Sequence, residues 1–198
     1  RGSAYCQLIR RQNKEKRLEW ARTHLHDSFE NVIWSDETTV QLETHKRFCY
    51  RKEGEKPRAK HPTKVHVWAG ISKKGATQVC VFEGVMKATL YCEILENTLL
   101  PFISAEFPHP NVHRFMQDND PKHTSRAAQH FFNSKGINWF RTPPESPDLN
   151  PIENLWHELK EYIRGVIKPK NKQELVEGIV RFWGTVDVHK CKRYINHL

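Results

Sequence analysis

The sequence predicts an α/β fold, a mixed central sheet flanked by helices, in one sizeable domain. The chain has 198 residues, enough for a single domain with its own core and some flanking segments. Segments rich in β-branched and aromatic residues come first, and further strand-like segments then alternate with helix-like ones. A meander of strands followed by such alternation favours a mixed sheet covered by helices.

The N-terminal segment, residues 1–28, is predicted to be a linker that contains one amphipathic helix. Within residues 13–26, apolar side chains such as Leu18 and Leu25 recur at helical spacing among charges. The domain itself is assigned to residues 29–198. Because the chain opens without an initiator methionine and its last helical pattern runs to the final residue, we expect a piece of a longer polypeptide.

The first predicted strand, residues 31–42, alternates its side chains between two faces. One face carries Val32, Trp34, Asp36, Thr38 and Val40, and the other carries Ile33, Ser35, Glu37 and Thr39. Asp36 and Glu37 therefore point in opposite directions. We expect only one of them to join a given site.

A polar and basic stretch, residues 43–64, follows this strand and interrupts the strand pattern. Its cations include Arg51, Lys52, Lys56, Arg58 and Lys60, and two prolines lie among them. We predict an extended arm inserted between strands. A merely solvated arm is the structural alternative.

The next segments predict a hairpin and a helix. Residues 65–71 and 76–83 have strand composition, and the loop between them ends in Gly75, where a positive φ is wanted. Residues 88–102 carry apolar side chains at helical intervals. This helix is expected to stop near Pro101, since proline cannot continue the hydrogen-bond ladder.

The second half of the chain predicts short strands alternating with helices. The strands are residues 112–117 and 137–140, and the helices are 124–135, 151–167, 173–183 and 188–198. The first of these strands delivers Asp118 at its C-terminal end. A proline-rich loop, residues 142–150, leads into the helix that carries Glu153.

Composition restricts the class of partner. The formal net charge is +9 and the isoelectric point is near 9.4, which favours a polyanion, either nucleic acid or an anionic membrane surface. No apolar run approaches the roughly 18 residues that span a bilayer, and no segment resembles a secretory signal, so we expect a soluble intracellular protein. The five cysteines are scattered without C-x-x-C spacing, which indicates neither a disulfide framework nor a zinc site.

Two aspartates occupy positions that local structure explains poorly. Asp36 lies in the middle of a strand, where its charge is costly to desolvate unless it is paired or metal-bound. From the strand pattern alone, a solvent-facing Asp36 is an equally good interpretation. Asp118 lies where ligand sites occur in open α/β sheets. Taken alone, an Asx-turn over Asp118-Asn-Asp-Pro is the better interpretation of that residue.

Glu153 has the strongest structural alternative. Asn150, Pro151 and Glu153 fit the N-cap, N1 and N3 positions of a capping box, and on spacing alone capping is the stronger interpretation. The helix also has a buried stripe and an adjoining polar face that carries Glu153, His157, Lys160 and Arg164. A carboxylate followed by bases suits a metal beside a phosphate backbone, and a salt-bridged solvated face has the same pattern.

Brought together, Asp36, Asp118 and Glu153 would form an oxygen-rich site for hard divalent metals, which is a site for phosphoryl transfer. His123 is a candidate ligand or base, and we assign it a supporting role beside the ligands; Asn154 receives the same assignment. Lys122 is either a DNA-phosphate contact or an ordinary surface lysine. Asp120 and Glu145 are interpreted as turn acids.

Three segments, residues 32–38, 115–125 and 144–160, resemble the catalytic domain of DDE transposases of the Tc/mariner superfamily. The resemblance extends from about Arg17 to the C-terminus. Asp118 and Glu153 are separated by 34 residues, the spacing of the Tc-like branch that ends in Glu. Long motifs in the right order make this a specific signal.

The resemblance implies a ribonuclease H-like fold with Asp36, Asp118 and Glu153 as catalytic acids that hold two Mg²⁺ ions, for which Mn²⁺ can substitute. It implies cleavage at transposon ends and transfer of the 3′-OH into target DNA at a TA dinucleotide, by a nuclear homodimer. The basic arm corresponds to a clamp loop that contacts DNA and the partner. Lys122, His157, Lys160 and Arg164 are assigned to DNA contact with it.

Two departures from the family pattern limit these expectations. The paired helix-turn-helix domains that recognise transposon ends would lie upstream of Arg1, and residues 67–75 are less glycine-rich than in some relatives. Two alternatives stay open: a non-catalytic DNA-binding remnant retained by a host, and another ribonuclease H-like nuclease. The intact acids favour the transposase over the first, and the motif at 144–160 favours it over the second.

Overall fold

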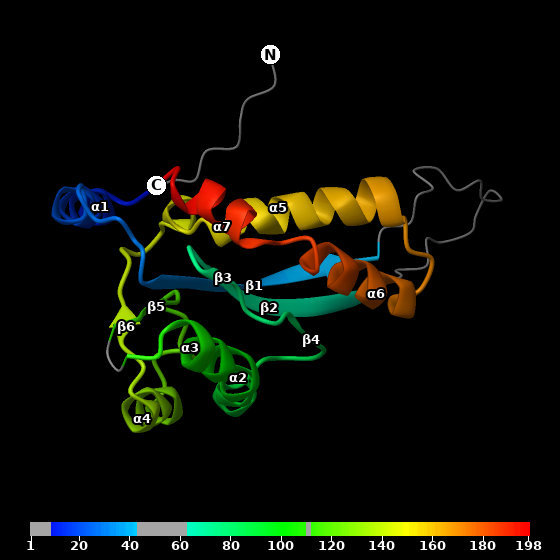
Figure 1. Ribbon diagram of the computed structural model, residues 1–198, viewed down its shortest axis with the longest axis horizontal. Coiled ribbons are helices and arrows are strands. Elements are labelled where there is room, and N and C mark those ends of the chain that lie inside the picture. Colours follow the sequence, from blue (N-terminus) through cyan, green and yellow to red (C-terminus); the bar gives the residue numbers. More distant parts are fainter. Residues whose placement is uncertain (1–8, 43–62, 110–111) are drawn as a thin grey trace, which may run out of the picture.

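The structure is a computed structural model that describes residues 9–42, 63–109 and 112–198 (Figure 1). Most of the predicted basic arm lies outside the described residues. So do five of the side chains proposed to contact DNA, Arg51, Lys52, Lys56, Arg58 and Lys60.

A mixed sheet forms the centre of the described chain, which confirms the predicted fold class. Its strands are β1 (Val32–Gln41), β2 (Lys64–Ser72), β3 (Gly75–Ala76), β4 (Cys80–Phe82), β5 (Arg114–Met116) and β6 (Trp139–Phe140). The order is β3-β2-β1-β5-β6, with β4 also paired to β2. β1 runs antiparallel to β2 and parallel to β5, so the chain changes from a meander to crossover connections at β1.

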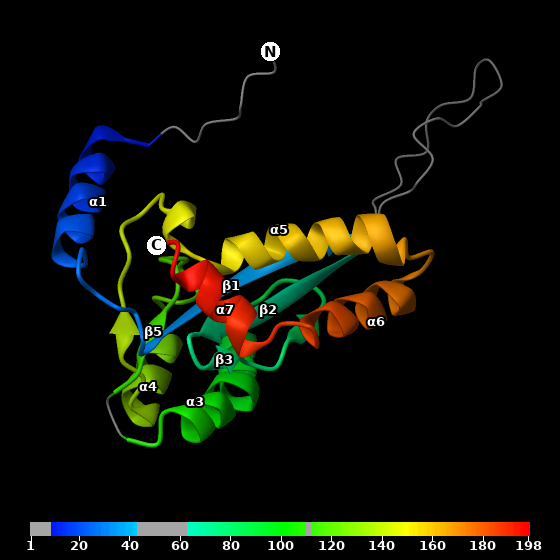
Figure 2. The ribbon, with the colours of Figure 1, turned by 45° about the horizontal axis from the view of Figure 1, so that its top comes forward.

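Helices cover both faces of this sheet (Figure 1). One face is covered by α2 (Ala88–Ile94), α3 (Leu100–Glu106) and α4 (Arg126–Lys135), and the other by α5 (Ile152–Tyr162), α6 (Lys172–Trp183) and α7 (Val188–Ile195). A further helix, α1 (Arg11–Thr23), lies at one end of the sheet (Figure 2). No helix of the described residues is both long and apolar enough to cross a membrane.

Alternation along β1 divides the core into two halves, as the period of a strand requires. Val32 and Trp34 pack among side chains of α5 and α6, whereas Ile33 packs among side chains of α2 and α4. All three are completely buried. The predicted division of β1 into two faces is therefore confirmed.

The predicted hairpin forms, but its second strand is interrupted. Gly75 has φ 140°, as the turn between β2 and β3 requires. β3 ends at Ala76 because Thr77 keeps only one ladder bond, from its amide to the Gly70 carbonyl (2.8 Å). Its hydroxyl accepts a hydrogen bond from the Gly70 amide (2.9 Å), while its carbonyl accepts one from the Trp183 indole (2.8 Å). The predicted strand 76–83 is consequently two short strands, β3 and β4.

The helix expected to stop near Pro101 continues to Glu106. A π-helical turn, η1 (Leu95–Leu99), joins α2 to α3, and Pro101 lies in the first turn of α3. A missing N–H is tolerated there, so proline does not end the segment. The sequence prediction was wrong at this point because it treated the segment as one regular α-helix.

Candidate active site

Parallel pairing of β1 with β5 brings the two aspartates together. Trp34 of β1 lies opposite Met116 of β5. Asp36 and Asp118 each follow two residues later in the same direction. The Ser35 hydroxyl donates to the Met116 carbonyl (2.8 Å) and fixes this register where β5 ends. Residues that are 81 positions apart in sequence are thus neighbours in the sheet.

Glu153 reaches the same place from the opposite direction. It lies in the first turn of α5, whose Ile152 and Leu155 are fully buried on either side of it. A pocket of about 340 Å³ is lined by Asp36, Asp118 and Glu153 together with the proline-rich loop. The structure therefore brings together the three acids that the sequence singled out.

The Asp36 and Glu153 carboxyl groups lie close enough to share a hydrogen bond. Burial, followed by the charge of Glu153, raises the pKa of Asp36 well above its usual value. Burial also raises the pKa of Glu153, although the charge of Lys160 opposes this shift. Two carboxylates held together in a pocket repel each other, so the pair favours a proton or a cation between them.

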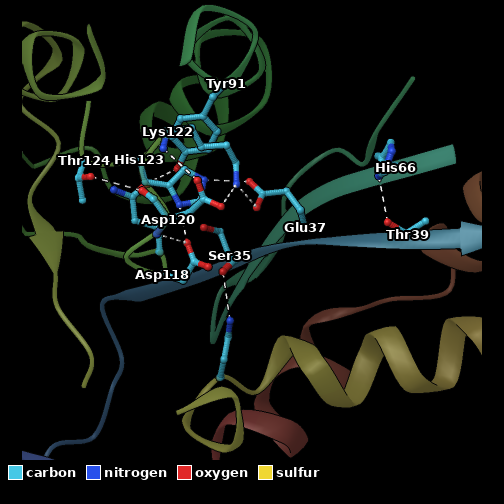
Figure 3. Close-up of polar contacts among 12 residues, drawn as sticks. Ser35, Glu37, Thr39, His66, Tyr91, Asp118, Asp120, Lys122, His123 and Thr124 are labelled. Atoms are coloured by element: carbon cyan, nitrogen blue, oxygen red, sulfur yellow. Dashed lines mark hydrogen bonds and ion pairs between the residues drawn. The ribbon is translucent and has the colours of Figure 1, made fainter. Parts of the chain in front are cut away.

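Asp118 is held by the turn that follows β5 (Figure 3). Its Oδ1 accepts hydrogen bonds from His123 Nδ1 (2.6 Å) and from the Asp120 amide (3.0 Å). Burial alone would raise the pKa of Asp118, but these two hydrogen bonds outweigh it and hold the pKa below its usual range. The Asx-turn that the sequence offered as an alternative is present, and it orients the carboxylate.

His123 bridges two carboxylates that come from different elements. Its side chain is almost completely buried, and while Nδ1 contacts Asp118, Nε2 lies 3.1 Å from Glu37 Oε1. Burial lowers the pKa of His123, but the two hydrogen bonds outweigh burial and raise that pKa to about 9. Both ring nitrogens consequently donate, and the ring is an imidazolium at neutral pH.

Sequence reasoning missed Glu37. Strand alternation correctly placed it on the opposite face from Asp36, but His123 lies on that face and connects it to Asp118. Lys122 joins the same group, since its ammonium contacts Glu37 (3.3 Å) and Asp120 (3.0 Å). Its side chain is only 18% exposed and is paired with these two acids, and its assignment to DNA contact stays a prediction.

The capping box predicted at the start of α5 does not form. The Asn150 side chain is buried and donates to the Ser35 carbonyl of β1 (3.2 Å), and no side chain caps this helix. The Asn150 carbonyl accepts the Glu153 amide instead (3.1 Å). The Ser35 carbonyl holds the Asn150 side chain through Nδ2, and Oδ1, the atom that a cap would use as acceptor, is buried without a hydrogen-bond partner among the described residues. Glu153 is thereby left to face Asp36.

The remaining predicted residues lie on and beyond α5. Asn154 is exposed, and its amide makes a long contact with the Pro151 carbonyl (3.5 Å), so its assigned supporting role stays a prediction. His157 and Lys160 lie on the exposed polar face of α5, and Arg164 follows in η3 (Ile163–Ile167), where it pairs with Glu161 (3.1 Å). This face continues from the pocket along the surface.

Within the described ranges, no three Asp, Glu, His or Cys side chains are grouped tightly enough to ligate a single ion as they stand. The acids instead form two connected parts. Asp36 and Glu153 make a close pair, and Asp118 stands beside them with its Oδ1 engaged by His123. Carboxylate oxygens are nevertheless the donors that Mg²⁺ and Mn²⁺ take, and they line one pocket.

Comparisons with known proteins agree with this geometry. The model of a family described as DDE superfamily endonuclease matches residues 31–176. The transposable element Tcb1 transposase of Caenorhabditis briggsae is 33% identical over 183 residues, which cover 86% of this chain and 66% of that protein. The chain therefore spans about two thirds of the length of this relative.

Solved structures share the fold at low sequence identity. The catalytic domain of Mos1 transposase, in a structure with Raltegravir and Mg, superimposes with a TM-score of 0.73 at 18% identity, covering 98% of this chain and 92% of that one. The Mos1 mariner paired end complex with Mn gives a TM-score of 0.78 at 17% identity, covering 100% of this chain and 62% of the other. The ribonuclease H-like architecture expected from the sequence is thus confirmed.

Proposed function

This chain belongs to the DDE superfamily endonuclease family, as the catalytic domain of a Tc/mariner transposase, and we propose that it cleaves and joins DNA strands by metal-dependent phosphoryl transfer. One observation carries the proposal. Asp36 from β1, Asp118 from the end of β5 and Glu153 from the first turn of α5 line a single pocket, although no local pattern requires them to meet.

The residues present fit divalent metal ions. Both Asp36 and Glu153 line the pocket and have raised pKa values, so a cation placed between them relieves the cost of their charges. Mos1 structures described with Mg and with Mn support the same use of metal here. We propose that the three acids hold two Mg²⁺ ions, for which Mn²⁺ can substitute. When bound, such ions activate the attacking oxygen and stabilise the leaving oxygen.

The surrounding residues keep the acids in place. His123, held by Glu37, fixes Asp118 through Oδ1, so Oδ2 is the oxygen outside these hydrogen bonds. Asn150 ties the start of α5 to β1 and so holds Glu153 beside Asp36. The nucleophile is water in the cleavage step and a DNA 3′-OH in the joining step, so no covalent bond to the protein is required.

DNA is the proposed substrate. Tcb1 is a transposase, and the Mos1 transposase paired-end complex with the left transposon end has the same fold. A net charge of +9 suits a phosphate backbone, and His157, Lys160 and Arg164 extend from the pocket along α5 and into η3. We further propose Arg51, Lys52, Lys56, Arg58 and Lys60 as DNA contacts, a TA target, a homodimer on DNA and a nuclear location.

Metal binding and nicking of a supercoiled plasmid test the proposal. We expect Mn²⁺ to bind this chain and to support nicking, and we expect both Asp118→Asn and Glu153→Gln to lower the nicking rate at least about 100-fold, the scale for losing a group that stabilises the transition state. Glu161→Gln is the matched control, because it removes an exposed carboxylate from the same helix. Undiminished nicking by Asp118→Asn would refute the catalytic role.

The competing function predicts a different outcome. A DNA-binding remnant would retain DNA affinity, but Mn²⁺ would neither bind at the acids nor support nicking. Anomalous density from Mn²⁺ in crystals, located between Asp36, Asp118 and Glu153, would exclude that alternative.

A further inference from the structure

The N-terminal helix α1 binds the proline-rich loop, which forms one wall of the acid pocket. Both guanidinium nitrogens of Arg17 bind Asp148, with Nη1 2.8 Å from Oδ1 and Nη2 2.5 Å from Oδ2. Nη1 also donates to the Glu145 carbonyl (3.3 Å). The Arg17 side chain is only 19% exposed, so this bidentate contact is largely shielded on the arginine side.

Two further residues, on either side of Arg17 in sequence, bind the loop and the strand end that precedes it. Arg10 donates its amide to Glu145 Oε2 (3.0 Å), and its Nε lies 2.9 Å from Oε1. The Trp20 indole donates to the Arg141 carbonyl (3.3 Å) and its ring packs near Phe140. In both ribbon views α1 lies beside the segment that leads into α5 (Figures 1 and 2).

The loop has hydrogen bonds of its own, from the Leu149 amide to the Ser146 carbonyl (3.1 Å) and from the Asn150 amide to the Pro147 carbonyl (3.0 Å). The contacts with α1 add to these. Residues 142–147 line the acid pocket, and three prolines in the loop supply no N–H. Glu145 has φ 56°, a left-handed conformation that costs a non-glycine residue free energy and persists only where its surroundings impose it. Arg17 binds the carbonyl of that residue, and Arg10 binds its carboxylate.

We propose that Arg17 is a positioning residue for the acid pocket, acting through Asp148 and Glu145, and that α1 is therefore a working part of the catalytic unit. In this role α1 sets the distance between the proline-rich wall and the Asp36–Glu153 pair, and so the width of the space that receives the reacting strand. This consequence for catalysis rests on the proposed function. The mechanical link, by which the contacts of α1 hold the loop in place, does not rest on the proposed function.

Hydrogen exchange of the 198-residue chain, without metal or DNA, tests the link. In Arg17→Ala we expect the amides of Leu149 and Asn150 to exchange about tenfold faster, the factor that losing one charge-assisted contact gives. Amides in β1 should keep their rates. Arg11→Ala is the matched control, because Arg11 is on the same helix with its side chain 96% exposed and only a 3.8 Å contact with Glu15.

Rescue distinguishes positioning from a general loss of stability. Exchanging the charges, Arg17→Asp together with Asp148→Arg, should restore most of the loop protection, whereas Arg17→Asp alone should lose it. Unchanged loop exchange in Arg17→Ala overturns the proposal. Faster exchange throughout the sheet overturns it as well, because Arg17 would then support the whole fold.

The consequence for the reaction has its own readout. Plasmid nicking by Arg17→Ala should show a lower kcat at unchanged Mn²⁺ affinity, since the metal-facing acids are untouched. An unchanged kcat beside faster loop exchange overturns the positioning role and leaves only the mechanical link. If Asp118→Asn nicks as well as the parent chain while Arg17→Ala loosens the loop, the proposed function fails and the link stands.

Discussion

The two walls of the acid pocket are built by different physics. On one side, Asp36 is paired with β2 two residues beyond the fully buried Trp34, and Glu153 lies in the first turn of a helix whose Ile152 is equally buried. On the other side, the proline-rich loop is held to α1 by arginine contacts at the surface. Burial and ladder hydrogen bonds hold the first wall, whereas ion pairs between partly exposed side chains hold the second.

This difference means that the acids are held in fixed positions, whereas the proline-rich loop can move. Groups that bind metal must stay within a fraction of an ångström of their working positions, which a packed core provides. A wall that only bounds the substrate can move, and surface ion pairs weaken with salt and exposure. The pocket therefore combines fixed acids with a boundary that one helix can shift.

Removing a buried side chain of α5, the helix that carries Glu153, should have the largest effect on the free energy of unfolding. Trp156 of α5 is 1% exposed and stacks on Trp183 at 5.5 Å. We expect Trp156→Ala to lower the free energy of unfolding by about 3–5 kcal/mol, measured by urea denaturation. His157→Ala, on the exposed face of the same helix, should change it by less than about 0.5 kcal/mol. Equal effects would show that α5 is not anchored by its buried face.

A smaller effect should come from the tie between the helix start and β1. Serine caps helices as well as asparagine does, but it is too short to reach the Ser35 carbonyl. We expect Asn150→Ser to cost about 1–2 kcal/mol of unfolding free energy by the same measurement. The control is Asn171→Ser, where the asparagine does cap α6 by accepting the Glu174 amide (2.9 Å). If Asn150→Ser costs no more than Asn171→Ser, the capping interpretation was correct.

The smallest effect on stability should appear in the segment between α1 and β1, and it should depend on pH. Arg114 of β5 binds Asp27 through two nitrogens (2.6 and 2.8 Å), and this holds the pKa of Asp27 below its usual value. Because the folded pKa is lowered, the stabilisation is present above about pH 4 and is lost as pH falls through the folded pKa.

We expect Asp27→Asn to cost about 1 kcal/mol at pH 7, since solvent screens a partly exposed pair. The difference from the parent chain should shrink as the pH approaches about 3 in urea denaturation series. Glu15→Gln removes an exposed acid of α1 and should show no such pH dependence. If Asp27→Asn loses the same unfolding free energy down to low pH, packing rather than charge holds the segment between α1 and β1.

Much of the fold followed from local pattern. Alternation along residues 31–42 predicted β1 and both of its faces, and the glycine at Gly75 predicted the hairpin turn. The predictions failed where a distant partner intervened. Thr77 leaves the strand because Gly70 and Trp183 bind it, and Pro101 does not end its helix because a π-helical turn precedes it.

The candidate site shows the same division. The three acids were selected from odd positions and from a resemblance, and the structure placed them in one pocket. Glu37 was set aside because the strand points it away from Asp36, which is true of the strand alone. His123 connects it to Asp118 across 86 residues of sequence, and no periodicity carries that information.

Local sequence pattern was enough to predict most of the strands and helices and to select the carboxylates that lack a local reason for their positions, because periodicity and residue chemistry are local properties. Only the tertiary structure decided that β1 and β5 align their aspartates, that Asn150 binds a strand instead of capping a helix, and that α1 holds the pocket wall. Each of these contacts joins groups that are distant in sequence and are buried together. Which groups are buried together is decided only when the whole chain folds around its core.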